Sequence, residues 1–387
     1  MDTKQIEDKY QLPTYHKFPL VIEKGRGAYI WDEKGNRYLD FYGGHAVALL
    51  GHCHPAVIKA VNGQMRRLIF YSNAVYNSMR AKAAKSLVSL APGSFSSVFF
   101  CNSGTEANET ALKLAKKFTG RDEIISFEGS FHGRTIGSLS VTGLKKYKEN
   151  VGSIISKVKF AKFGDIDAVK KLITKETATI ILESIQSIAG VREASGKFYQ
   201  QLRKITKERK IILIFDEVQT GLGRSGKMFF GEHFGVMPDL LTLAKGLAGG
   251  LPAGAVMVSE KIAKSVQYGD QGCTFGGGPV ISAAILSTID AIQKEKLCEN
   301  AGRVGKILKK ELISLSHVEK VTGEGLLLGI KLDVPAKEVQ SKLLKKFILT
   351  GTSDDPNVLR LMPPLIISKK ETDYFLSGLS KVLGGGI

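Results

Sequence analysis

Ile211–Glu217 (IILIFDE) and Leu240–Lys245 (LLTLAK) are short apolar runs, and each ends in a charged side chain. Continuous apolar runs of this length are typical of strands buried on both faces of a parallel sheet. Open α/β sheets bind their ligands at the carboxyl ends of such strands. We therefore expect Asp216 and Lys245, which are 29 positions apart (245 − 216), to lie at one edge of one sheet.

Lys245 also opens a glycine-rich turn, Gly246–Pro252, a junction that partly removes its amine from water. Desolvation favours the neutral, nucleophilic form of a lysine. Such a lysine can hold pyridoxal 5'-phosphate as a Schiff base, while an aspartate keeps the pyridine nitrogen of the cofactor protonated. Asp216 suits the second role, because a buried carboxylate without a partner is costly. Gln219 could donate to the phenolic oxygen of the cofactor, so the two runs together predict a pyridoxal phosphate site.

The bulk composition is that of a globular protein. The chain has 387 residues, of which 43% are hydrophobic and 24% charged, and it exceeds one average domain in length. No apolar run reaches the ~18 residues of a membrane span, and residues 1–5 (MDTKQ) lack an apolar signal-peptide core, so we expect neither feature. The cysteines are few and scattered, which fits a reducing compartment and predicts a cytoplasmic protein. They are Cys53, Cys101, Cys273 and Cys298.

The formal net charge of +18 allows two interpretations. One is a lysine-rich, solvated surface. The other is an anionic partner, which could be a phosphorylated cofactor, a dicarboxylate substrate or an acidic protein. Nucleic acid is disfavoured, because the basic residues are dispersed and Trp31 is the only tryptophan, so there is no basic-aromatic stripe.

The middle of the chain alternates apolar runs with helix-like stretches, which predicts a mainly parallel α/β/α sheet. The expected strands are Ser97–Cys101, Glu123–Phe127, Thr179–Glu183, Ile211–Asp216, Leu240–Leu243 and Ala255–Val258. The expected helices include Thr105–Thr119 and Ser195–Glu208, and a hairpin is expected around the turn at residues 32–36. We predict a large domain over residues 51–274 and a small α+β domain built from residues 1–50 and 275–387.

A phosphate site is expected where the strand Ser97–Cys101 passes into a helix. Ser103 and Glu106 have capping-box spacing, Gly104 lets an anion approach the backbone, and free amides at a helix start attract phosphate. Taken alone, the same residues fit an ordinary capped helix. Phe131, on a glycine-flanked loop, could stack on a flat cofactor or could cover the core.

Arg360 lies in an apolar neighbourhood, Val358–Pro364 (VLRLMPP). A guanidinium group there needs an anion. A substrate carboxylate held by two parallel hydrogen bonds is the functional candidate, and a structural pair with Asp or Glu is the alternative.

Two further patterns point to other chemistry and are weaker. Gly221–Gly226 (GLGRSG) matches the dinucleotide pattern G-x-G-x-x-G, which would suggest an NAD-dependent dehydrogenase, but the following residues 227–231 start a helix poorly. The run His52–His54 (HCH) resembles a metal cluster, yet Gly51 and Pro55 bracket it as a turn and no further ligand follows at useful spacing. We expect no metal.

Over nearly its whole length, the chain resembles the class-III aminotransferases of the pyridoxal phosphate fold-type I superfamily. Within that family it is most similar to acetylornithine aminotransferases, and particularly to relatives that serve lysine and arginine biosynthesis on a carrier protein. The stretches that carry the resemblance are residues 40–55, 102–108, 131–135, 215–226, 243–254, 274–277 and 359–364.

The resemblance implies a role for each matching residue. Lys245 would hold the cofactor and carry the proton, Asp216 and Gln219 would contact the ring, and Phe131 would stack on it. Gly104 and Thr105 would bind its phosphate, and Thr274 would reach the phosphate in the neighbouring subunit of a homodimer. Arg134, with Cys273 beside it, would grip the carboxylate of the amino donor, and Arg360 the α-carboxylate of glutamate or 2-oxoglutarate.

One departure from the family concerns Glu183–Gly190 (ESIQSIAG), where the family often reads E-P-x-Q-G-E-G-G. Ile188 stands where relatives have a glutamate that can pair with the substrate arginine, so Arg360 would lack that partner. Cys273 stands where serine is usual.

The resemblance implies transfer of the δ- or ε-amine of an α-N-blocked ornithine or lysine to 2-oxoglutarate. The expected block is an acidic carrier protein, and N-acetylornithine is the alternative. Ornithine or 4-aminobutyrate aminotransferases are the rivals within the class.

Overall fold

The computed structural model describes residues 1–91, 93–152 and 154–384, and it arranges their strands in three sheets. The central sheet has seven strands, and all neighbours pair in parallel except those of β10, which is antiparallel to both β4 and β9. In spatial order the strands are β4 (Ser97–Cys101), β10 (Gly254–Val258), β9 (Leu240–Leu243), β8 (Ile212–Asp216), β7 (Thr177–Glu183), β5 (Glu123–Phe127) and β6 (Val158–Ala161).

This architecture confirms the predicted mainly parallel α/β fold, and each predicted strand lies within two residues of its observed bounds. The sequence reasoning missed β6. Its four residues, VKFA, place Lys159 between apolar side chains, and β6 is an edge strand that is mostly half-buried. An edge strand needs no continuous apolar run, so it lacked the pattern that revealed its neighbours.

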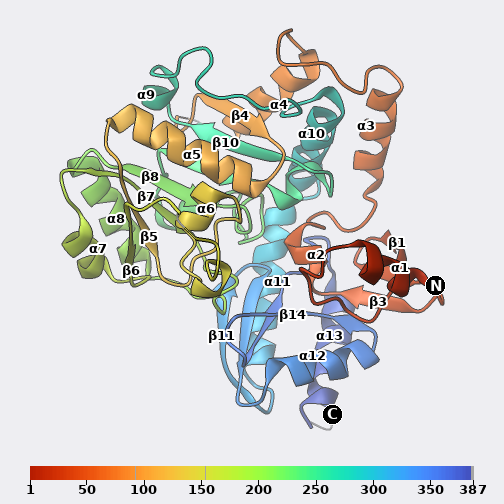
Figure 1. Ribbon diagram of the computed structural model, residues 1–387. Helices are drawn as coiled ribbons and strands as arrows, with labels where there is room; N and C mark the ends of the chain where they lie inside the picture. The colour runs from red at the N-terminus through yellow and green to blue at the C-terminus, as the bar shows by residue number, and fades with distance from the viewer. Residues whose placement is uncertain (92, 153, 385–387) are drawn as a thin grey trace.

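Helices cover both faces of the central sheet (Figure 1). α5 (Gly104–Thr119) packs its alanine-rich stripe against one face, where it meets Ile214 of β8. α8 (Gly196–Glu208) covers the other face, where it meets Leu213 and Phe215. The alternation along β8 follows from the two-residue repeat of a strand, so both faces of β8 are dry and Asp216 ends the strand inside the protein.

The remaining helices around this sheet lie in the same part of the chain or directly after it. They are α3 (Pro55–Met65), α4 (Ser78–Ser89), α6 (Ile136–Ser140), α7 (Ile166–Leu172), α9 (Glu260–Ala263) and α10 (Pro279–Lys294), with 3-10 turns η1 (Lys145–Tyr147), η2 (Phe230–Phe234) and η3 (Lys245–Ala248).

The two chain ends build the other two sheets (Figure 1). The expected hairpin is present as β2 (Tyr29–Asp32) and β3 (Arg37–Asp40), and the C-terminal β13 (Ile348–Leu349) joins it by pairing in parallel with β3. β1 (Ile22–Arg26) completes this sheet. The third sheet is antiparallel, with β11 (Val318–Glu324), β12 (Leu327–Leu332), β15 (Val358–Leu361) and β14 (Gly351–Thr352). The helices of the chain ends are α1 (Thr3–Tyr10), α2 (Gly43–Ala46), α11 (Leu297–Leu312), α12 (Ala336–Lys345) and α13 (Lys369–Val382).

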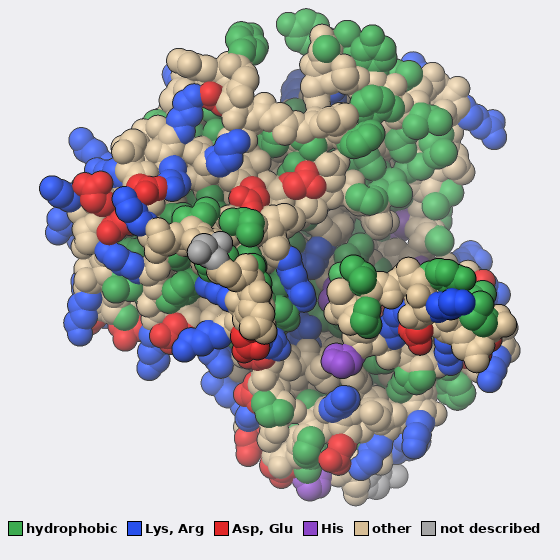
Figure 2. Space-filling view, in the orientation of Figure 1, with side chains coloured by type: hydrophobic (Ala, Val, Ile, Leu, Met, Phe, Trp, Pro, Cys, Tyr) green, Lys and Arg blue, Asp and Glu red, His purple; other side chains and the backbone are tan. Residues whose placement is uncertain are grey.

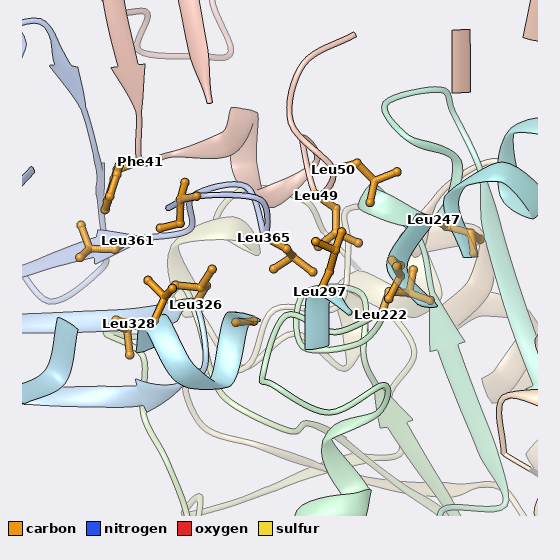
Figure 3. Close-up of a cluster of buried hydrophobic side chains, with 14 of the residues drawn as sticks. Phe41, Leu49, Leu50, Leu222, Leu247, Leu297, Leu326, Leu328, Leu361 and Leu365 are labelled. Atoms are coloured by element: carbon orange, nitrogen blue, oxygen red, sulfur yellow. The ribbon is translucent and has the colours of Figure 1, made fainter. Parts of the chain in front are cut away.

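One apolar cluster joins the chain ends to the middle of the chain. Figure 3 shows Phe41, Leu222, Leu247, Leu297 and Leu361 together in this buried cluster. The core is therefore continuous across the predicted boundaries at residues 51 and 274, and the division into two domains stays a prediction. The last three residues of the predicted small domain, 385–387, lie outside the described residues. No helix in the described part of the chain has the length and apolarity to cross a bilayer.

Candidate active site

The ends of β8 and β9 bring Asp216 and Lys245 to the same sheet edge. The two strands are parallel neighbours, and Asp216 pairs with Thr242, so Lys245 lies only three residues beyond that partner. The predicted juxtaposition therefore follows directly from strand register.

A network of buried polar groups fixes the carboxylate of Asp216. Its Oδ2 accepts hydrogen bonds from Asn108 Nδ2 at 2.7 Å and pairs with His132 Nδ1 at 2.7 Å, while its Oδ1 accepts from the amide of Val218 at 3.1 Å. Asn108 is itself oriented, because Thr242 Oγ1 donates to its Oδ1 at 2.8 Å. The carboxylate is thus held in one position before any ligand arrives.

Lys245 follows β9 with φ of +47°, in the left-handed region that favours glycine. A non-glycine residue in this conformation stores strain, which is commonly found at functional positions. Burial lowers the pKa of the Lys245 amine to about 8, although Asp216 and Glu183 act in the opposite direction. The amine forms no ion pair within the described residues, so the position favours a neutral nucleophile.

Glu183 ends β7 next to this pair. Its Oε1 accepts from the amide of Phe131 at 2.8 Å. Burial, reinforced by the charge of Asp216, raises the pKa of Glu183 to about 7. The site therefore contains one fixed carboxylate and a second carboxyl group that titrates near neutrality.

The start of α5 lies beside the same sheet edge. A Cβ on Gly104 would come within 3.0 Å of the Val218 side chain and 3.6 Å of Ala244, so any larger residue here would push against Val218. Ser103 caps the helix by accepting from the amide of Glu106, which leaves the amides of Gly104 and Thr105 without partners inside the helix. Unpaired amides at a helix start suit a phosphate group.

These residues fit pyridoxal phosphate. Gln219 is compatible with this group, because its side-chain Oε1 is buried and has no hydrogen-bond partner within the described residues. The amide is therefore not fixed by the protein through that oxygen, and its Nε2 could donate to a ligand oxygen. The start of α5, the fixed Asp216 carboxylate and the desolvated Lys245 amine lie at the same sheet edge, and their predicted roles toward the cofactor stay predictions.

Arg360 reaches this region from β15 and is almost fully buried, with 7% of its surface exposed. Its Nε donates to the carbonyl of Thr352 at 2.6 Å, and its Nη1 donates to Ser187 Oγ at 3.0 Å. No carboxylate forms an ion pair with it among the residues described. Burial lowers the pKa of its guanidinium, while Tyr42, Glu183 and Tyr147 act to raise it.

Arg134 and Phe131 meet at Tyr147. The guanidinium of Arg134 lies over the Tyr147 ring at 4.3 Å from its centroid, and the ring of Phe131 contacts the same tyrosine edge-on at 5.3 Å. Arg134 is exposed, in contrast to Arg360. Tyr147 is therefore the common contact of Arg134 and Phe131.

Cys273 and Thr274 lie apart from this group within the chain. Cys273 Sγ contacts Asn102 Nδ2 at 3.2 Å and Glu106 Oε2 at 3.7 Å, at the start of α5. Thr274 is exposed on the surface. Their predicted roles in substrate binding and in the neighbouring subunit stay predictions.

Within the described residues, the structure offers neither a dinucleotide site at Gly221–Gly226 nor a shared metal site at His52–His54. The loop Gly221–Gly226 leads into turns and then the 3-10 turn η2, with no α-helix start to bind a dinucleotide. His52 pairs with Asp40 at 2.8 Å and His54 with Glu295 at 3.1 Å, so each has its own carboxylate. Among the described residues there is no group of three or more His, Cys, Asp or Glu that could hold a metal ion.

Several residues of the site were not assigned a role from sequence. Asn108 could have been found from sequence, because a polar residue on the alanine- and leucine-rich buried face of α5 needs a hydrogen-bond partner. His132 stood next to Phe131, but nothing in the sequence placed it against Asp216. Nothing in the local sequence pointed to Ser187 or Tyr147, because only the fold brings Ser187 to Arg360 and Tyr147 to Arg134.

Comparison with known proteins agrees with this geometry. Residues 10–383 match the family model described as aminotransferase class-III. The acetylornithine aminotransferase of Methanopyrus kandleri is 44% identical over 385 residues, covering 99% of each chain. The [LysW]-aminoadipate semialdehyde transaminase of Deinococcus radiodurans is 39% identical, covering 97% of this chain and 89% of its own. Among solved structures, an ornithine aminotransferase from Toxoplasma gondii with PLP in partial occupancy at its active site superposes with a TM-score of 0.93 at 29% identity, covering 98% of this chain and 93% of that one.

Proposed function

Because this chain belongs to the class-III aminotransferases, which are pyridoxal-phosphate-dependent enzymes, we propose that it acts on an α-N-blocked ornithine or lysine. It transfers the terminal amino group of that substrate to 2-oxoglutarate, which gives a semialdehyde and glutamate. The reaction belongs to lysine or arginine biosynthesis, or to both. The names of the relatives from M. kandleri and D. radiodurans support this substrate class.

The cofactor contacts follow from the residues at the sheet edge. When bound, pyridoxal phosphate stabilises negative charge on the substrate carbon that loses a proton. Asp216 would accept a hydrogen bond from the protonated ring nitrogen, and Lys245 would hold the cofactor and carry the proton at its Nζ. Gln219 would donate to the ring oxygen, and Phe131 would stack on the ring.

The phosphate is held separately, by the amides of Gly104 and Thr105. Because the start of α5 and the end of β8 are fixed by the same sheet, the two anchoring points keep a constant spacing.

The placement of two guanidinium groups carries the substrate assignment: Arg360 is buried with no carboxylate partner among the described residues, and Arg134 lies over the Tyr147 ring that Phe131 also contacts. Two carboxylate receptors near one cofactor suit a reaction whose two substrates both carry carboxylates. We assign Arg360 to the α-carboxylate of 2-oxoglutarate or glutamate. We assign Arg134 to the carboxylate of the amino donor, and we assign Cys273 to the same donor although it lies apart from Arg134 within one chain.

The blocking group is the finer part of the proposal. A carrier protein with an acidic surface is favoured by the net charge of +18. It is also favoured by the prefix [LysW] in the name of the D. radiodurans relative, which we interpret as a carrier. The Lys and Arg side chains are spread around the edges of the face in Figure 2. Acetyl is the alternative block, and it is supported by the M. kandleri relative. Unblocked ornithine is a third candidate, because the T. gondii structure is an ornithine aminotransferase.

We also propose that the enzyme works as a homodimer in the cytoplasm. Figure 2 shows hydrophobic side chains gathered on the side of the molecule where Figure 1 places α3. Large apolar side chains are exposed there in unusual number, which is typical of a protein interface. They include Ile58, Met65, Leu68, Ile69, Phe70, Tyr71, Val75, Tyr76 and, beside Thr274, Phe275. The four free cysteines fit a reducing compartment.

A panel of amino donors tests the proposal. Initial rates are measured with 2-oxoglutarate and free, N-acetylated or carrier-attached forms of ornithine and lysine. We expect kcat/KM to be highest for one blocked donor and at least about tenfold lower for the free diamino acid, because Arg134 selects the carboxylate end and the block leaves only the terminal amine to react. Equal kcat/KM for acetylated and carrier-attached donors would contradict the proposed carrier protein. A higher kcat/KM for the free diamino acid would contradict the proposal that the α-amine is blocked.

A further inference from the structure

The binding of Arg360 within the chain is unusual, because both of its described partners are neutral. Its Nε donates to the carbonyl of Thr352 and its Nη1 donates to Ser187 Oγ at 3.0 Å. A buried guanidinium normally pairs with a carboxylate, since burying an unpaired charge is expensive. Here the two neutral acceptors fix the direction of the guanidinium, and no carboxylate among the described residues pairs directly with its positive charge.

Ser187 is itself held firmly. It is fully buried and begins a tight turn, in which its carbonyl accepts from the amide of Val191 at 3.2 Å. Its amide donates to Glu183 Oε2 at 3.4 Å. In the same turn, the carbonyl of Ile188 accepts from the amide of Asp354 at 2.7 Å, which ties the turn to the segment that follows Thr352. The hydroxyl and the carbonyl that contact Arg360 are thus kept at a constant separation.

We propose that Ser187 is a positioning residue that holds Arg360 as a permanently open carboxylate receptor. The hydroxyl orients the guanidinium without neutralising it, so no internal carboxylate has to move aside before a substrate binds. The inference rests on the proposed function for the identity of the substrate, 2-oxoglutarate. It adds that the resting holoenzyme accepts a dicarboxylate at Arg360 before any amino transfer takes place.

Glutarate, a dicarboxylate that has no keto group and cannot accept an amine, tests this on the resting holoenzyme. Its dissociation constant is measured by titration calorimetry for the unmodified enzyme, Ser187→Ala and Ser184→Ala. Ser184 is a matched control, because it is equally buried at the same strand end and its Oγ has no hydrogen-bond partner among the described residues. We expect Ser187→Ala to weaken glutarate roughly two- to tenfold, the loss expected for one orienting hydrogen bond, and Ser184→Ala to have no effect.

Kinetics provide the second readout. In Ser187→Ala the KM for 2-oxoglutarate should rise by the same factor, while kcat and the KM for the amino donor stay within about twofold, because the donor carboxylate is assigned to Arg134. Ser187→Cys, which fills nearly the same space with a weak acceptor, should behave like Ser187→Ala and replaces it should the alanine variant fold poorly.

Two results would overturn the inference: no glutarate binding to the unmodified holoenzyme, or equal dissociation constants for the Ser187 and Ser184 variants. These outcomes are separate from failure of the proposed function. An enzyme that turns over no blocked donor, yet loses glutarate affinity only in the Ser187 variants, would refute the substrate and support the receptor.

Discussion

The end of β8 and the end of β15 hold their charged side chains in opposite ways. At the end of β8, the carboxylate of Asp216 receives hydrogen bonds from Asn108, His132 and Val218, and Asn108 is oriented in turn by Thr242. On β15, Arg360 has two neutral partners and no carboxylate within the described residues. One charge is surrounded by fixed partners, and the other is oriented but left unpaired.

The difference between Asp216 and Arg360 matches the ligands proposed for them, a cofactor for Asp216 and a substrate carboxylate for Arg360. The cofactor is the same in every turnover, so in the proposed role a rigid set of hydrogen bonds around Asp216 would place the ring without further reorganisation. The substrates alternate, so the second end needs a charge that a carboxylate can occupy and leave. A charge already paired inside the protein would have to be released each time. We therefore expect changes at Asp216 to lower kcat and changes at Arg360 to raise KM.

The largest effect is expected for Asp216→Asn. The amide has nearly the same shape but no negative charge, so it does not hold a proton on the pyridine nitrogen. Loss of one preorganised electrostatic contact at a reacting group costs roughly 10²- to 10³-fold in kcat. Steady-state rates should show this loss with the KM for 2-oxoglutarate changed by less than about threefold.

Asp239→Asn is the matched control for that change. Asp239 is as buried as Asp216 but is paired with Arg203 at 2.8 Å, and it precedes β9 instead of following β8. The control should lower the melting temperature and leave kcat within about twofold. A comparable kcat loss in both variants would mean that any buried carboxylate lost from the sheet impairs the enzyme, and the special role of Asp216 would be wrong.

The second effect concerns the pH dependence of cofactor capture by Lys245. Burial lowers the pKa of this amine to about 8, so the neutral fraction grows about fiftyfold between pH 6 and pH 8 and then levels off. The rate at which the apoenzyme takes up pyridoxal phosphate should follow this curve, measured by absorbance. Hydride trapping followed by mass spectrometry should place the adduct on the peptide that carries Lys245.

N-α-acetyllysine in solution is the control for capture, because its amine has the ordinary pKa of lysine and reacts with the same pyridoxal phosphate. Its rate should keep rising through pH 10. An enzyme rate that also keeps rising, or an adduct on a different lysine, would contradict the desolvated amine at this position.

The sequence was informative at the cofactor end and poor at the substrate end for a physical reason. Asp216 and Lys245 end continuous apolar strands, so strand register alone brings them together, and their neighbours Gly104 and Gln219 lie in the adjoining turns. Ser187 reaches Arg360 only through the packing of segments far apart in the chain. A local pattern contains no information about such contacts, just as it contained none about the edge strand β6.

Arg360→Lys tests the substrate end with the charge retained. Lysine keeps one positive charge but loses the planar fork that binds a carboxylate through two hydrogen bonds and that donates to both Thr352 and Ser187. The KM for 2-oxoglutarate should rise roughly tenfold, as expected for one lost charge-assisted hydrogen bond, with kcat changed much less. Arg134→Lys is the control, because Arg134 is exposed and is assigned to the donor carboxylate; its effect on the KM for 2-oxoglutarate should stay below about twofold. Equal increases in KM in the two variants would mean that both arginines contact the same carboxylate. The contrast between buried Arg360 and exposed Arg134 would then no longer explain how the enzyme distinguishes 2-oxoglutarate from the amino donor.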